Sequence, residues 1–96
     1  MKVQNLDEKV SSIINDRQVF MDYFKARYPA FNNSNIFSRD LQYAVKRYLE
    51  FKGFKADFKD AGLVAAQVAA TFVNDGTFLV IDGNTFRLKQ EAVVAN

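Results

Sequence analysis

The fold of this chain is decided by residues 61–89, whose sequence is AGLVAAQVAATFVNDGTFLVIDGNTFRLK. Residues 61–73 form an apolar run without any charge, and the tripeptide Asn-Asp-Gly ends it. Residues 77–81 and 85–89 alternate like short strands, and the turn-forming tripeptide Asp-Gly-Asn separates them. The stretch therefore predicts a helix that leads directly into an antiparallel β-hairpin.

The uncharged helix is unusual, because a helix on the surface of a protein normally shows one polar face. A helix that is apolar all round is normally buried, and its alanines allow neighbouring elements to approach closely. We therefore expect residues 61–73 either to be central to the fold or to form part of an interface with a partner.

The hairpin has two possible two-residue turns, Asp82-Gly83 and Gly83-Asn84, and the second gives the better pairing. Four apolar side chains then face the helices: Ile81 opposite Phe86, and Leu79 opposite Leu88. The same alternation places Phe78 and Val80 on the outer face. There they need cover from the ends of this chain or from another chain.

Two more helices precede this stretch. Apolar residues recur at helical spacing over residues 7–28, and Asn15-Asp16 is a point at which this segment can divide into two shorter helices. Pro29 ends the segment, because the residue before a proline avoids helical backbone angles. A further helix over residues 38–52 has Ser38 as its expected N-cap and Gly53 as its C-terminal glycine.

The connection between these helices contains one short apolar pair, Ile36-Phe37, that can add a small strand. The prediction is an α+β fold in which a three-helix core packs against a C-terminal antiparallel hairpin. At 96 residues the chain is expected to form a single globular domain, residues 1–96, with residues 90–96 as a flexible tail.

Composition removes many classes of chemistry. The chain has neither cysteine nor histidine, so thiol nucleophiles, disulfides, the usual general base and the commonest metal ligands are missing. There is no phosphate-binding glycine loop and no calcium loop. We therefore expect no catalytic residue, no cofactor and no metal site. Without an apolar run of membrane-spanning length or an export signal, the expected location is cytoplasmic, with no membrane partner.

A basic, aromatic-rich segment runs from Lys46 to Lys59. Cations there can neutralise phosphates while aromatic rings stack on unpaired bases. The other interpretation, which we prefer, is that the phenylalanines belong to the core and the lysines form a solvated rim. The candidate nucleic-acid contacts, including two hairpin residues, are Lys46, Arg47, Lys52, Lys55, Lys59, Arg87 and Lys89. Ser38-Arg39 at a helix start can bind an anion, although ordinary capping explains Ser38 equally well.

The order helix, short strand, helix, helix, hairpin resembles a winged-helix domain, and the match covers Ile36 to Lys89. The part that carries the resemblance is FVNDGTFLVIDGNTFRL, residues 72–88, which looks like the end of a third helix followed by a wing. The resemblance implies that this helix enters the DNA major groove and that the wing touches the backbone. The matching helix offers only Gln67, Thr71 and Asn74 as polar groups, so a winged helix used for protein contacts fits these residues better.

These observations favour a non-enzymatic interaction module that binds a protein partner, or itself as a homodimer, through the apolar helix and the outer hairpin face. The expected interface residues are Phe78, Val80, Gln67 and Thr71. The alternative is a winged-helix-like nucleic-acid-binding domain that uses the basic segment at 46–59 together with the hairpin.

Overall fold

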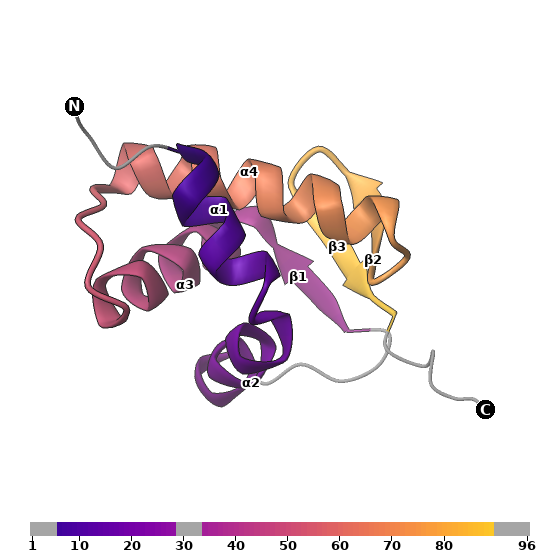
Figure 1. Cartoon of the computed structure of the whole chain (residues 1–96). Coiled ribbons are helices and arrows are strands. Elements are labelled where there is room, and N and C mark those ends of the chain that lie inside the picture. The colour runs from indigo at the N-terminus through magenta and orange to yellow at the C-terminus, as the bar shows by residue number, and fades with distance from the viewer. Residues whose placement is uncertain (1–5, 29–33, 90–96) are drawn as a thin grey trace.

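The computed structural model describes residues 6–28 and 34–89, and it shows four helices beside a three-stranded antiparallel sheet (Figure 1). The expected α+β class with a C-terminal hairpin is confirmed. In chain order the elements are α1 (Leu6–Ile14), α2 (Arg17–Arg27), β1 (Asn35–Phe37), α3 (Ser38–Phe51), α4 (Phe58–Asn74), β2 (Phe78–Asp82) and β3 (Thr85–Leu88). The predictions for Pro29 and for a flexible tail at 90–96 fall outside the described residues.

The first helical segment is divided at Asn15-Asp16, so α1 and α2 are separate helices. Asn and Asp favour helix ends, because their short polar side chains compete with the helical backbone for hydrogen bonds. The division lets each helix bury its own apolar side chains. Ile13 of α1 and Phe20 and Phe24 of α2 all belong to the core.

The start of α3 differs from the prediction. Phe37 is the N-cap residue, and Ser38 is the first helical residue and makes no capping bond with its side chain. The reason is that β1 runs directly into α3. The amide of Ser38 donates instead to the carbonyl oxygen of Asn84 in the hairpin turn, at 2.8 Å.

The end of α3 is as predicted. Gly53 has a φ of 94°, a conformation that glycine adopts at low cost. The amides of Gly53 and Phe54 donate to the carbonyls of Glu50 and Leu49, at 3.0 and 2.9 Å. These two bonds make a Schellman motif. Phe54 then packs against the core.

Helix α4 is central to the fold but is not buried all round. It begins earlier than residue 61, because the Asp57 carboxylate caps it by accepting from the Asp60 amide at 2.8 Å. One face packs against α1, α3 and β2. The residues buried on that face are Ala61, Val64, Ala65, Val68, Ala69 and Phe72. Leu63, Ala66, Gln67 and Ala70 remain exposed on the other side.

The sheet has the strand order β1-β3-β2, so the small strand β1 pairs with the hairpin strand β3. Ile36 lies opposite Phe86. The confirmed strand at Ile36-Phe37 thus extends the hairpin into a sheet whose edge meets the start of α3. Ile36, Phe78 and Leu88 are buried and belong to the same core as the helices.

The predicted hairpin register is wrong by one residue in β2. An irregularity between Val80 and Asp82 leaves Ile81 without a direct partner, so Val80 lies opposite Phe86 and Phe78 lies opposite Leu88. Because a shift by one residue exchanges the two faces of a strand, Phe78 points into the core, with 2% of its surface exposed. Leu79 and Ile81, which were expected to face the helices, are exposed.

Candidate functional site

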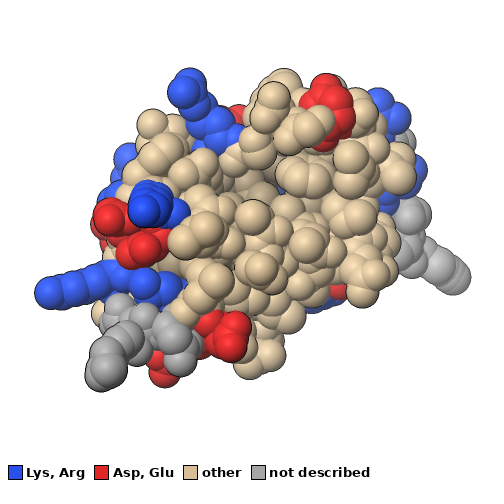
Figure 2. Space-filling model, turned by 90° about the horizontal axis from the view of Figure 1, so that it is seen from above, with Lys and Arg blue, Asp and Glu red and all other residues tan. Residues whose placement is uncertain are grey.

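The side of the molecule formed by α4 and the hairpin carries a broad surface with few charges. Figure 2 shows this side, with no Lys, Arg, Asp or Glu across its middle and charged residues gathered toward its margins. Five large apolar side chains are exposed on these elements: Phe58, Leu63, Leu79, Val80 and Ile81. Val80 lines a hollow beside α4, and exposed apolar side chains around such a hollow are a usual mark of an interaction site.

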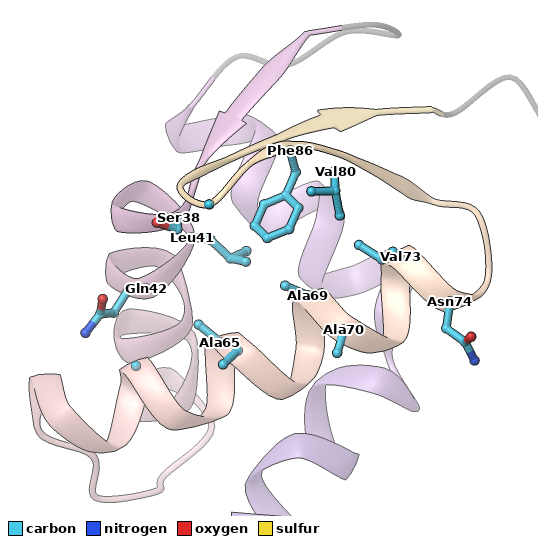
Figure 3. A pocket seen from close by; sticks show the side chains of 13 residues that line it. Ser38, Leu41, Gln42, Ala65, Ala69, Ala70, Val73, Asn74, Val80 and Phe86 are labelled. Carbon is cyan, nitrogen blue, oxygen red and sulfur yellow. The ribbon is translucent and has the colours of Figure 1, made fainter.

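A groove of about 490 Å³ opens on this surface between the start of α3, one side of α4 and the tip of the hairpin (Figure 3). No charged residue of the described chain lines it. Its lining residues are Ser38, Leu41 and Gln42 of α3, Gly62, Ala65, Ala66, Ala69, Ala70, Val73 and Asn74 of α4, and Val80, Gly83 and Phe86 of the hairpin. We call this feature the α4 groove.

The groove exists because α4 is built from small side chains on this side. Ala65, Ala66, Ala69 and Ala70 recur three to four residues apart, a spacing that keeps them together on one side of a helix. Larger side chains there would fill the space between α4 and the hairpin. Phe86 and Val80 from the hairpin and Leu41 from α3 form the walls (Figure 3).

Two hydrogen bonds fix the walls of the groove relative to each other. The Ser38 amide donates to the Asn84 carbonyl, which ties α3 to the hairpin turn. The side-chain amide of Gln42 donates to the Phe58 carbonyl at 2.9 Å, which ties α3 to the first turn of α4. Gly62 leaves room for this second bond, since a Cβ at this position would lie 2.7 Å from Nε2 of Gln42.

The four predicted interface residues do not form one surface. Val80 lines the groove and is 53% exposed. Phe78 is in the core and is not an outer-face residue. Gln67 is exposed and Thr71 is half-buried, and neither lines the groove. The Thr71 hydroxyl donates to the Gln67 carbonyl at 3.0 Å within α4.

The candidate nucleic-acid contacts fall into two separate groups. Five of them lie on α3, on the following loop and at the start of α4, whereas Arg87 and Lys89 lie on or just after β3, at the other end of the molecule (Figure 1). Lys46 pairs with Glu50 at 2.6 Å, and Lys52 pairs with Asp16 at 3.4 Å. Arg47, Lys55 and Lys59 are exposed.

The interpretation that the phenylalanines of this segment are core residues is wrong for Phe51, which is 73% exposed. Phe58 is also exposed, and its ring lies 4.9 Å from that of Tyr43. Phe54 is the only one of the three that packs against the core. The buried face of α3 ends with Tyr48 and Leu49, and Phe51, the last residue of the helix, lies beside that face with most of its surface exposed.

The groove itself was not anticipated from the sequence. The sequence signal for it is the set of alanines in residues 61–73, which by itself predicts close packing by neighbouring elements. Nothing in the local sequence shows that α3 and the hairpin tip leave the alanine-lined side of α4 uncovered.

Two further properties of the described chain bear on function. Within residues 6–28 and 34–89, no three acidic, histidine or cysteine side chains are grouped closely enough to hold a metal ion. In the same ranges, no helix combines the length and the hydropathy that a membrane span requires.

Comparison with known proteins gives no relative. No family model, no curated protein and no solved structure matches this chain. The winged-helix resemblance stays a prediction, and any proposal about function depends on the chain's own residues.

Proposed function

We propose that this chain is a non-enzymatic interaction module whose α4 groove binds an apolar helical segment of a partner protein. The observation that carries the proposal is the groove itself, which is open, has no charge among its described lining residues, and has the exposed Val80 of the hairpin on its wall. Apolar grooves of this kind take the apolar face of an amphipathic helix in known recognition modes.

The shape of the α4 wall supports a helix as the occupant. Its lining residues extend from Gly62 to Asn74, a distance of about 18 Å at 1.5 Å per residue. Small side chains at three- and four-residue spacing form shallow grooves between the ridges of a helix, and the ridges of a second helix pack into them. Gln42 and Asn74 at the margins can hydrogen-bond to polar groups that flank the apolar stripe.

A different protein fits this site better than a second copy of this chain. To fill the groove, a helix needs exposed apolar side chains at positions i, i+4 and i+7. In the described part of the chain, no helix exposes such a stripe. The large apolar side chains exposed on helices are Val19, Tyr43, Phe51, Phe58 and Leu63, and no three of them share that spacing.

The test is selection of binders from a displayed library of amphipathic helical peptides, followed by affinity measurement with two matched variants. Ala70→Glu puts a charge into the groove, and Gln67→Glu puts the same charge on the exposed side of α4 outside it. We expect the selected peptides to lose at least tenfold in affinity for Ala70→Glu, because a carboxylate would be buried against an apolar face.

The affinity for Gln67→Glu should stay close to that of the wild type. A library that yields no binder, or binders that do not distinguish the two variants, would show that the groove is not the site. Sedimentation of the wild-type chain alone checks the alternative occupant. A dimer that Ala70→Glu dissociates would replace the partner protein with a second copy.

A further inference from the structure

A second exposed feature lies at the other end of α3, on residues that do not line the α4 groove. Three side chains from α2 and α3 follow one another. The Arg27 guanidinium lies over the Tyr23 ring at 4.8 Å, and the Tyr23 ring stacks on that of Phe51 with centroids 6.2 Å apart and planes 27° apart. We call this arrangement the aromatic ladder.

The ladder ends in an open ring. Phe51 is 73% exposed, more than any other large apolar side chain in the described part of the chain. Its other aromatic neighbour is the fully buried Tyr48, at 6.4 Å, which supports Phe51 from the core side. The ring is therefore held by its neighbours while much of its surface is left to solvent. An aromatic or planar ligand can stack there.

Cations flank the ladder on both sides. Arg47 precedes Phe51 by four residues, which puts their side chains next to each other on α3, about 5–6 Å apart at Cβ. Arg27 occupies the opposite end. Neither forms an ion pair with another residue of the described chain, and both are exposed. Lys55 follows in the loop after α3 and is also exposed.

We propose that the aromatic ladder binds single-stranded nucleic acid, with a base stacked on Phe51 and the adjacent phosphates at Arg47 and Arg27. Exposed rings beside unpaired cations are the two components of sequence-tolerant single-strand binding. A duplex offers phosphates but keeps its bases stacked on each other, so it uses only the cations. An acidic peptide likewise satisfies the arginines and leaves the ring without a flat partner.

The experiment measures fluorescence anisotropy of a short labelled oligothymidylate with the full chain at low salt and at moderate salt. An abasic deoxyribose-phosphate oligomer of the same length and a polyglutamate peptide are the controls for charge alone. We expect the oligothymidylate to bind at least tenfold more tightly than either control, and we expect Phe51→Ala to abolish that advantage. Binding should weaken with salt, because phosphate contacts release counterions.

The chain supplies matched control variants for both components. Phe37→Ala removes another half-exposed phenylalanine, on β1, and Arg39→Gln removes another exposed arginine of α3. Arg47→Gln should weaken binding to the oligothymidylate and to the abasic oligomer alike, whereas Phe37→Ala and Arg39→Gln should leave both unchanged. No binding at low salt, equal affinity for the abasic oligomer or polyglutamate, or equal affinity of Phe51→Ala and wild type would each overturn the proposal.

Discussion

At the scale of single residues, the hydroxyl of Tyr48 is a polar group buried without a hydrogen-bond partner in the described part of the chain. Tyr48 is completely buried, with the Phe20 ring edge-on at 5.3 Å. A buried polar group without a partner loses its hydration and gains nothing in return. Tyr48 therefore contributes apolar ring contacts at the cost of an unsatisfied hydroxyl.

Tyr48→Phe should raise the free energy of unfolding by about 1 kcal/mol, because the ring stays and the unsatisfied hydroxyl is removed. Burial raises the pKa of the Tyr48 phenol, Asp16 adds to this and Lys52 opposes it. The unfolded chain therefore loses this proton first, and wild-type stability should fall as the pH rises above the ordinary value of 10.0. In Tyr48→Phe this contribution to the alkaline loss disappears.

Urea unfolding, measured from neutral pH to pH values above the pKa of the free phenol, tests both the stabilisation by Tyr48→Phe and the alkaline loss of stability. Tyr43→Phe is the matched control, since Tyr43 lies on the same helix and is 42% exposed. If Tyr48→Phe were less stable than the wild type, the hydroxyl would have a partner that supports the fold.

At the scale of elements, the packing of α3 on α4 depends on a glycine of α4 that leaves room for a glutamine side chain of α3. Gly62 lies inside α4, where glycine costs about 1 kcal/mol relative to alanine. A Cβ at this position would meet the side-chain amide of Gln42, which binds the Phe58 carbonyl. The glycine therefore keeps a contact between the two helices at the expense of helix propensity.

Gly62→Ala alone should change the free energy of unfolding little, because the gain in propensity is offset by the loss of the Gln42 bond, about 1 kcal/mol each. In a Gln42→Ala background the same substitution should stabilise by the full amount. A double-mutant cycle in urea unfolding measures the difference as a coupling of about 1 kcal/mol. Additive effects of the two substitutions would show that the side chains do not compete for the same space.

The elements also show where sequence reasoning works and where it ends. The Gly53 motif and the Asn15-Asp16 division depend on local backbone preferences, and these can be read from neighbouring residues. The face of the sheet on which each β2 side chain lies depends on the irregularity at Ile81. This irregularity is compatible at once with the turn, with the pairing of β2 and β3, and with the core contact of Phe78. No short stretch of sequence contains all three constraints, so the alternation of β2 by itself predicts the wrong face for Phe78, Leu79 and Ile81.

The same limit applies to the two candidate sites. The α4 groove needs α3, α4 and the hairpin tip to meet around a row of alanines, and the aromatic ladder needs α2 beside the end of α3. Each is made from segments far apart in the chain. From the sequence, the basic and aromatic character of residues 46–59 was visible, but the exposure of Phe51 and its stacking on Tyr23 were not.

At the scale of the whole molecule, an ion pair joins α2 to the end of α4, next to the start of the hairpin. The Arg17 guanidinium at the start of α2 binds the Asp75 carboxylate at the end of α4, and it also lies over the Phe72 ring at 4.9 Å. The same carboxylate accepts from the amide and hydroxyl of Thr77, at 3.0 and 2.7 Å. Asp75 thus holds α2, the end of α4 and the start of the hairpin together.

This arrangement predicts an acid-sensitive contribution to stability. Partial burial by itself would raise the pKa of Asp75, but the hydrogen bonds from Arg17 and Thr77 and the charge of Arg17 outweigh it and hold the pKa below its ordinary 3.8. The folded state therefore binds this proton less readily than the unfolded state does. The contribution is fully present well above pH 3.8 and is lost as the pH falls through the lowered folded-state pKa.

Asp75→Asn should lower the free energy of unfolding at neutral pH by roughly 1 kcal/mol, a modest value because both side chains are partly exposed to solvent and its screening. Below the ordinary aspartate pKa the difference from the wild type should shrink, since the wild-type carboxyl is then protonated too. Arg17→Gln should reproduce the neutral-pH loss, and the double variant should lose less than the sum because the two substitutions break one bond. Thermal unfolding followed by circular dichroism across this pH range measures these differences. The difference in the free energy of unfolding between Asp75→Asn and the wild type could instead stay constant as the pH falls below the aspartate pKa. Asp75 would then act through its shape and its bonds to Thr77, and its charge would not link α2 to the end of α4.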